Sequence, residues 1–208
     1  MALLVLVRHG QSVWNAKGLW TGLMDIPLSD KGEDEAKHTG LILKNYKFDV
    51  AFTSTLKRAQ QTLDILLKES GQQETPIIKS AALNERDYGI YTGKNKWEVE
   101  KKIGGAEFLK IRRSWDFPIP KGESLRQVSE RVYPYYVESI LPFLKEHKNV
   151  LIAAHGNSIR ALIKHLDNVS DDKAPMIEVT TGEADIYTMD EAGNVIRKER
   201  MAVNKTEA

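Results

Sequence analysis

Two runs of apolar residues without polar alternation, 3–7 and 150–154, mark the hydrophobic pattern of this chain. Runs of this length are typical of strands that are buried on both faces, as in a parallel sheet covered by helices. Residues 50–52 and 76–78 are two shorter strand candidates. The pattern therefore predicts a sheet whose central strands have no solvent-exposed face.

Helical spacing of apolar residues follows these strands. It predicts helices at 30–44, 56–68, 124–147 and 157–166. Residues 30–33 have the composition of a capping box, and Ser124 to Gln127 form another helix start. Pro134 or Pro142 should kink or break the long helix at 124–147. Residues 84–121 should be irregular, with three short helical segments at most.

The end of the chain has the pattern of a hairpin, with strands at 184–189 and 195–200 around a polar turn. We expect residues 201–208 to form a polar, mobile tail. Strands that alternate with helices predict an α/β fold, a three-layer α/β/α sandwich with a mostly parallel central sheet. We find no linker or repeat, so we expect one catalytic domain over 1–208.

Composition and charge narrow the possible functions. The 208 residues include 30 basic and 29 acidic side chains, a net charge of +1, and no cysteine. The absence of cysteine excludes disulfides, thiolate nucleophiles and Cys-ligated metals, and fits a cytoplasmic location. The balanced charge argues against a general nucleic-acid or membrane binder.

The predicted sheet places two histidines at strand ends, where α/β proteins bind ligands. One strand ends at His9-Gly10 and another at His155-Gly156. Arg8 and Arg58 lie near strand ends too, and a guanidinium suits a phosphate group. Neutral donors could complete such a site, namely Ser12, Asn15, Thr21, Ser54 and Asn157, although these residue types also occur as ordinary turn and capping residues.

Two histidines could also bind a metal. Zinc sites usually need at least three protein ligands, and no HExxH motif or other recognisable ligand spacing occurs. Nearby arginines would repel a cation, so we expect no metal. The sequence contains neither a GxxxxGK[ST] nor a GxGxxG loop, which argues against a nucleotide site.

Several segments together resemble a known family. The segment RHGQSVWN at 8–15 resembles the signature of the histidine phosphatase superfamily. The segments LNER at 83–86, NK at 95–96, RR at 112–113, GESL at 122–125 and AAHGNS at 153–158 resemble, more narrowly, the cofactor-dependent phosphoglycerate mutases. The similarity extends over nearly the whole chain.

The resemblance assigns a role to each matching residue. His9 matches the nucleophile that forms a phosphohistidine, and Glu85 matches the general acid/base, for which we expect a pKa raised by burial or by nearby negative phosphate. His155, Arg8 and Arg58 match groups that contact the transferring phosphoryl group. The implied substrate and phosphate ligands are Ser12, Asn15, Thr21, Gly22, Arg86, Tyr88, Lys96, Arg112, Arg113, Gly156 and Asn157.

The implied reaction interconverts 3-phosphoglycerate and 2-phosphoglycerate in glycolysis and gluconeogenesis. 2,3-Bisphosphoglycerate would supply the priming phosphate, and no metal would be needed. The partners would be small phosphorylated three-carbon acids, with the chain a monomer or a dimer. Gln11, Asp87, Glu183 and a short connection at 113–122 depart from the family pattern. A phosphatase, a bisphosphoglycerate synthase and a non-catalytic binding protein remain as alternatives.

Overall fold

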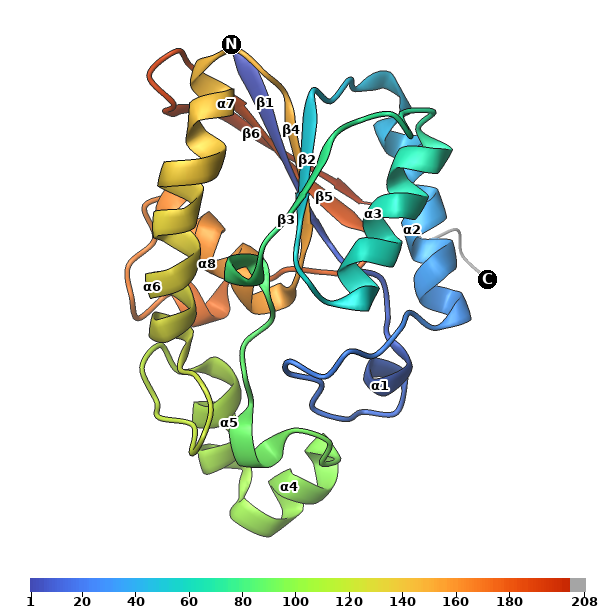
Figure 1. Ribbon diagram of the computed structural model, residues 1–208. Helices are drawn as coiled ribbons and strands as arrows, with labels where there is room; N and C mark the ends of the chain where they lie inside the picture. Colours follow the sequence, from blue (N-terminus) through green and yellow to red (C-terminus); the bar gives the residue numbers. More distant parts are fainter. Residues whose placement is uncertain (203–208) are drawn as a thin grey trace.

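A six-stranded sheet forms the centre of the protein, in a computed structural model that describes residues 1–202 (Figure 1). The strands lie in the order β3-β2-β4-β1-β5-β6. Their bounds are β1 Ala2–Arg8, β2 Val50–Thr53, β3 Ile77–Lys79, β4 Val150–Ala154, β5 Glu183–Met189 and β6 Val195–Ala202. The first four strands are parallel to one another, and β5 and β6 form an antiparallel hairpin at one side. The mostly parallel sheet is confirmed.

Helices cover both faces of this sheet. In Figure 1, α2 (Asp30–Ile42) and α3 (Lys57–Glu69) lie on one side, and α6 (Leu125–Tyr135), α7 (Leu141–Lys145) and α8 (Gly156–Leu166) on the other. Alternate residues of β1 divide between the two cores: Leu4 and Leu6 pack with α6 and α8, Val5 and Val7 with α3. The three-layer sandwich is therefore confirmed, and it explains why the central strands carry no polar alternation.

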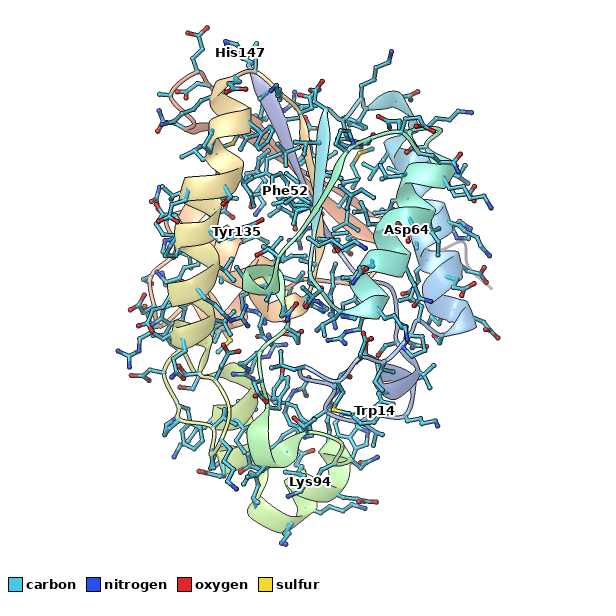
Figure 2. The ribbon with its side chains drawn as sticks, in the orientation of Figure 1. Trp14, Phe52, Asp64, Lys94, Tyr135 and His147 are labelled. Carbon is cyan, nitrogen blue, oxygen red and sulfur yellow. The ribbon has the colours of Figure 1, made fainter. Side chains whose placement is uncertain are left out.

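The long helix predicted at 124–147 is interrupted, as its prolines suggested. A π-helical turn at Tyr136–Ile140 separates α6 from α7, and Pro134 and Pro142 lie on either side of it. Proline has no N–H to donate, so the regular ladder cannot continue through these positions. Figure 2 shows Tyr135 of α6 and Phe52 of β2 in the core between helix and sheet, and their ring centroids are 6.4 Å apart.

One helix start differs from the prediction. Ser29, not Asp30, caps α2: its Oγ accepts a hydrogen bond from the Gly32 N–H at 3.2 Å, and its backbone is extended. The expected capping box at 30–33 was thus wrong by one residue. The box at Ser124 and Gln127 is confirmed, with hydrogen bonds of 3.2 and 2.8 Å. A 3₁₀ turn at Leu43–Asn45 extends α2.

The segments that follow the strands gather beyond the carboxyl edge of the sheet, at the bottom of Figure 1. They contain α1 (Val13–Ala16), α4 (Lys96–Ile103) and α5 (Gly105–Arg113), together with 3₁₀ turns at Ala81–Leu83, Gly89–Tyr91 and Ala174–Met176. A third apolar cluster holds them together; it consists of Trp20, Val99, Phe108, Ile111 and Ile119. This arrangement leaves a pocket between the sheet edge and the α4–α5 segment.

The end of the chain corrects another expectation. Met201 and Ala202 pair with Ala184 and Glu183 in the β5–β6 hairpin, so they do not belong to a tail. The rest of the expected tail, 203–208, lies outside the described residues. Across 1–202, no helix combines the length and apolar character that crossing a membrane requires.

Candidate active site

A polar pocket opens at the carboxyl ends of β1 and β4. Thirteen of its lining residues were proposed from the sequence: Arg8, His9, Asn15, Thr21, Gly22, Arg58, Glu85, Tyr88, Lys96, Arg112, Arg113, Gly156 and Asn157. Trp20, Arg160, Glu178 and Val179 complete the lining. The pocket therefore unites residues from distant parts of the chain, because the ends of parallel strands meet at one edge.

His9 presents one defined nitrogen to this pocket. Its Nδ1 lies 2.6 Å from the Gly10 carbonyl, which can only accept, so Nδ1 carries the proton. Nε2 then holds the lone pair, and the Arg58 Nε–H donates to it at 3.3 Å. The backbone N–H of His9 bonds to Ala154 O at 2.9 Å, which fixes β1 against β4 at this point. His9 is thus held in the tautomer that can attack an electrophile through Nε2.

His155 lies directly beside His9. The two ring centroids are 4.9 Å apart, at an angle of 63°. Nε2 of His155 is 2.7 Å from the Ser54 hydroxyl, whereas its buried Nδ1 has no hydrogen-bond partner within residues 1–202. An unpartnered polar atom in a buried site indicates a place for a ligand.

Arg58 and Arg8 supply fixed positive charge around the histidines. Arg58 is fully buried and donates to the carbonyls of Met24 and Gly22, each at 2.8 Å. Burial lowers its pKa to about 10, so it stays charged at neutral pH. Arg8 donates to Val179 O at 2.8 Å, and its buried Nε lacks a partner in the described part of the chain.

Both histidines are neutral at physiological pH. Burial lowers the pKa of His9 well below its ordinary value, and the neighbouring His155 and the positive charges of Arg58 and Arg8 lower it further. Burial and the same two arginines also hold the pKa of His155 low. A neutral imidazole keeps the lone pair that nucleophilic attack requires.

Glu85 is the buried carboxylate of the site. Its Oε1 accepts hydrogen bonds from Arg86 N at 2.7 Å and from the Asn157 side-chain amide at 2.9 Å. Burial tends to raise the pKa of Glu85, but these hydrogen bonds and the charges of Arg58 and Arg8 lower it below its ordinary value. A raised pKa was expected; without a bound anion, the direction is opposite because the hydrogen bonds and the arginines stabilise the ionised carboxylate.

The mouth of the pocket carries further cations. Lys96 begins α4, and burial together with the neighbouring Arg112 lowers its pKa to about 8. Arg113 donates to Pro175 O at 3.0 Å and to Glu178 at 3.2 Å. Tyr88 accepts a hydrogen bond from the Asn157 amide at 3.1 Å. The mouth can therefore hold a second anionic group of a ligand whose first group lies at His9.

Several residues in the proposed set have mainly structural contacts. The Ser12 hydroxyl caps α1 by accepting a hydrogen bond from Asn15 N at 3.1 Å. Ser12 is therefore a capping residue in this structure, the alternative given for it above. Arg86 lies behind Tyr88, where its NH2 donates to Ile111 O at 2.8 Å and its guanidinium packs 4.5 Å from the Tyr88 ring centroid. Neither residue lines the pocket. By contrast, Asn15 and Thr21 line the pocket, and the Asn15 side-chain amide donates a hydrogen bond to the Thr21 hydroxyl at 3.4 Å.

Sequence reasoning missed Arg160 and Glu178 as pocket residues. Arg160 follows Asn157 by about one helical turn. Its position in the helical pattern of apolar and polar residues is the one expected for a solvent-exposed side chain. Glu178 lies in an irregular segment after η5 (Ala174–Met176). The segment HGNSIR contained Arg160, but periodicity alone does not distinguish it from a surface arginine.

Within residues 1–202, one group of side chains has a spacing that could bind a metal. Donor atoms of His9, Glu85 and His155 lie within 4.8 Å of one another. However, Arg58 directs an N–H at the free nitrogen of His9, and the positive charge of Arg8 lies nearby. This donor set favours an anion over a cation, since N–H groups and guanidinium charge stabilise negative oxygens.

Comparisons with known proteins identify the family of this chain. The family model for the histidine phosphatase superfamily (branch 1) matches residues 4–201. The chain is 47% identical to the 2,3-bisphosphoglycerate-dependent phosphoglycerate mutase of Parvibaculum lavamentivorans over 96% of both chains. It is 48% identical to the phosphoglycerate mutase of Schizosaccharomyces pombe, covering 95% of this chain and 94% of that protein.

Solved structures show the same fold. Bacillus stearothermophilus YhfR superimposes with a TM-score of 0.82 at 26% identity, over 94% of both chains. The phosphoglycerate mutase of Bacillus anthracis has a TM-score of 0.74 at 24% identity, over 97% of this chain and 92% of that one. The chain therefore belongs to branch 1 of the histidine phosphatase superfamily, among relatives that are named as phosphoglycerate mutases.

Proposed function

We propose that this protein interconverts 3-phosphoglycerate and 2-phosphoglycerate, using His9 as the phosphorylated residue and 2,3-bisphosphoglycerate as the priming donor. One observation carries the proposal: Nε2 of a neutral His9 faces an arginine-lined pocket, with the Glu85 carboxylate beside it. The names of the relatives at 47–48% identity support the same reaction.

The unpartnered polar atoms support a phosphoryl group at His9. Arg8 Nε and His155 Nδ1 are buried without hydrogen-bond partners in residues 1–202. Arg8 precedes His9 in the sequence, and the ring centroid of His155 lies 4.9 Å from that of His9. If the Ser54 hydroxyl donates to His155 Nε2, the proton of His155 lies on Nδ1, ready for a phosphoryl oxygen. With Arg58, these groups would balance the charge of the equatorial oxygens during transfer.

The chemistry divides into two half-reactions. In the first, the 2-hydroxyl of 3-phosphoglycerate attacks the phosphorus held on His9 Nε2. The P–N bond breaks as the new P–O bond forms, and Glu85 takes the hydroxyl proton. The product of this transfer, 2,3-bisphosphoglycerate, reorients in the pocket. His9 Nε2 then attacks its phosphoryl group at the 3-position, and Glu85 returns the proton to the departing oxygen. His9 is then phosphorylated again and 2-phosphoglycerate is released.

The protonation of Glu85 fits this order. Before substrate binds, the lowered pKa keeps the carboxylate ionised, as a base must be. Once phosphoryl groups surround it, their negative charge raises the affinity of Glu85 for a proton. The carboxyl group can then serve as an acid in the second half-reaction. Bound phosphoryl groups would thus raise the pKa of Glu85, which is one of the two causes, burial or nearby negative phosphate, from which a raised pKa was expected.

The cations at the mouth support the choice of substrate. Lys96, Arg112 and Arg113 line the same pocket as His9 and suit the carboxylate and second phosphate of a small acid. A closed pocket would also exclude water, which otherwise hydrolyses the phosphohistidine. We place this reaction in glycolysis and gluconeogenesis, in the cytoplasm, and assign it no metal.

The test follows 2-phosphoglycerate and free phosphate in one reaction. Enzyme is mixed with 3-phosphoglycerate, with and without a catalytic amount of 2,3-bisphosphoglycerate. We expect the bisphosphate to stimulate formation of 2-phosphoglycerate, which should far exceed the release of phosphate. Phosphate release that outpaces isomerisation would instead identify a phosphatase, and unchanged turnover in His9→Ala would exclude the phosphohistidine.

A further inference from the structure

Arg160 contacts the amide group that holds Glu85. Its NH1 donates to Asn157 Oδ1 at 2.7 Å, and its Nε donates to Ile177 O at 2.9 Å. The opposite side of the same amide, Asn157 Nδ2, donates to Glu85 Oε1 at 2.9 Å and to Tyr88 OH at 3.1 Å. Arg160, Asn157 and Glu85 thus form a continuous hydrogen-bonded chain into the pocket.

These hydrogen bonds determine the orientation of the Asn157 amide. An asparagine amide can turn so that its oxygen and nitrogen exchange places. A guanidinium has only donors, so it must face Oδ1. With Oδ1 turned toward Arg160, Nδ2 is directed at Glu85, whose ionised oxygens accept only. The reversed amide would set two acceptors against each other at Glu85.

The same contacts distinguish the two oxygens of Glu85. Oε1 receives Arg86 N at 2.7 Å, Asn157 Nδ2 at 2.9 Å and Asn157 N at 3.3 Å. Within residues 1–202 no hydrogen bond reaches Oε2. Oε2 lies 3.8 Å from the position that a Cβ on Gly156, a pocket residue, would occupy.

We propose that Arg160 is a positioning residue that fixes the Asn157 amide, so that Oε1 of Glu85 stays hydrogen-bonded and Oε2 carries the proton during catalysis. The proposal rests on the proposed function, because it concerns the acid/base step of that reaction. Arg160 acts through Asn157 and need not touch the substrate. It therefore differs from Arg112 and Arg113, whose expected partner is the ligand itself.

Other charged and titratable groups near Glu85 define the background for a pH measurement. They are Arg8, His9, Arg58, Tyr88, Lys96, Glu123, Arg131 and His155. None of them contacts Asn157 Oδ1. Changing Arg160 to methionine removes the donors toward Oδ1 while it keeps an unbranched stem. Lysine retains a charge and can donate one hydrogen bond to the same oxygen.

The experiment measures the rate at which phosphorylated enzyme transfers its phosphoryl group to 3-phosphoglycerate, by rapid quench across a pH series. This step needs ionised Glu85, so the rate falls on the acidic side. In Arg160→Met we expect the acidic limb to move up by about one pH unit, the value of one hydrogen bond to a charged group. Arg160→Lys should restore most of the wild-type profile. Arg126→Met is the matched control, because Arg126 is exposed and lies outside the pocket. This change should leave the pH profile unchanged.

A second variant distinguishes positioning from direct binding. In an Asn157→Ala background, Arg160→Met should cause a much smaller shift, because the amide that it orients is gone and only the attraction between the guanidinium and Glu85 is lost. A raised KM for 3-phosphoglycerate with an unmoved pH limb would overturn the proposal and make Arg160 a substrate ligand. Additive shifts in the double variant would overturn it as well. Failure of wild-type enzyme to form 2-phosphoglycerate would instead contradict the proposed function.

Discussion

The hydrogen bond between His9 Nδ1 and the Gly10 carbonyl decides which ring nitrogen can react. Because the carbonyl accepts a hydrogen bond from Nδ1–H, the other ring nitrogen, Nε2, keeps its lone pair and faces Arg58. The low pKa of His9, caused by burial and nearby positive charge, keeps the ring neutral. The same arginines that favour the neutral ring also stabilise the phosphoryl group that it would carry.

Lys96 should give substrate binding a pH dependence. Its pKa is lowered to about 8, mainly by burial and then by Arg112. As pH rises through this value the free enzyme loses a positive charge, so kcat/KM for 3-phosphoglycerate should fall above about pH 8. Lys96→Arg should abolish this fall, since a guanidinium stays charged throughout the range. Steady-state kinetics from pH 6.5 to about 9.5 test this prediction, and an identical alkaline limb in the arginine variant would contradict it.

At the scale of elements, the site depends on a close contact between the loop after β1 and the start of α2. A Cβ on Gly10 would lie 2.1 Å from Gly32 O, and a Cβ on Gly32 would lie 2.0 Å from Gln11 O. The two backbones therefore touch without intervening side chains. This contact holds the turn that follows His9 and so orients the imidazole.

Gly10→Ala should therefore destabilise the protein. Because the backbone of Gly32 cannot move aside freely, we expect the free energy of unfolding to decrease by about 2 kcal/mol or more, the usual effect of overpacking. Gly105→Ala is the matched control: its Cβ would meet only Glu100 Oε1, at 3.9 Å. That change should alter the free energy of unfolding by less than about 1 kcal/mol. Urea unfolding of both variants measures the two changes in free energy. Equal stabilities would show that the contact between Gly10 and Gly32 does not limit the size of the side chain at position 10.

The elements also show how far sequence reasoning reaches. Apolar runs predicted the buried strands, because a strand covered on both faces needs no polar alternation. The exact start of α2 was missed because Ser29 and Asp30 are both good capping residues, and only the backbone angles distinguish them. The strand-end histidines pointed to the pocket, since topology brings strand ends together.

Tertiary contacts account for the residues that the sequence did not reveal. Arg160 is held at the pocket by its hydrogen bonds to Ile177 O and Asn157 Oδ1. Glu178 is held there by the hydrogen bond that it accepts from Arg113. The direction of the Glu85 pKa shift was also beyond the sequence. It depends on the balance between burial and the hydrogen bonds and charges that converge on one carboxylate.

At the scale of the whole molecule, charge is unevenly distributed. The net charge is only +1, yet within residues 1–202 six cationic side chains line the pocket beside two carboxylates, Glu85 and Glu178. The excess of positive charge in the pocket is balanced by acids elsewhere on the chain. A nearly neutral protein can thus present a strongly positive site to a small anion.

This separation predicts a marked salt dependence. Raising the ionic strength from about 0.05 to about 0.5 M should lower kcat/KM for 3-phosphoglycerate several-fold, because salt screens the attraction between the pocket and the anion. The thermal midpoint should change little, since the net charge is small. Kinetics at matched pH in sodium chloride measure the effect, and kcat/KM that is insensitive to salt would contradict a field that guides the substrate.

Chelation tests the distribution of charge in another way. Arginines and His155 surround the place where a metal would otherwise balance phosphoryl charge. Extended dialysis against EDTA should therefore leave both 2-phosphoglycerate formation and the thermal midpoint unchanged. Loss of activity that zinc or another divalent ion restores would support a metal bound by His9, Glu85 and His155.

The most direct test of the account asks whether His9 carries the transferred phosphoryl group. Enzyme is incubated with 2,3-bisphosphoglycerate labelled with ³²P in its phosphoryl groups, freed of excess donor, and then mixed with unlabelled 3-phosphoglycerate. We predict an acid-labile label on His9, located by peptide mapping and absent from the His9→Ala variant. On addition of 3-phosphoglycerate this label should move into 2-phosphoglycerate and 2,3-bisphosphoglycerate. Label that never joins the protein, or that appears only as free phosphate when 3-phosphoglycerate is added, would contradict the account.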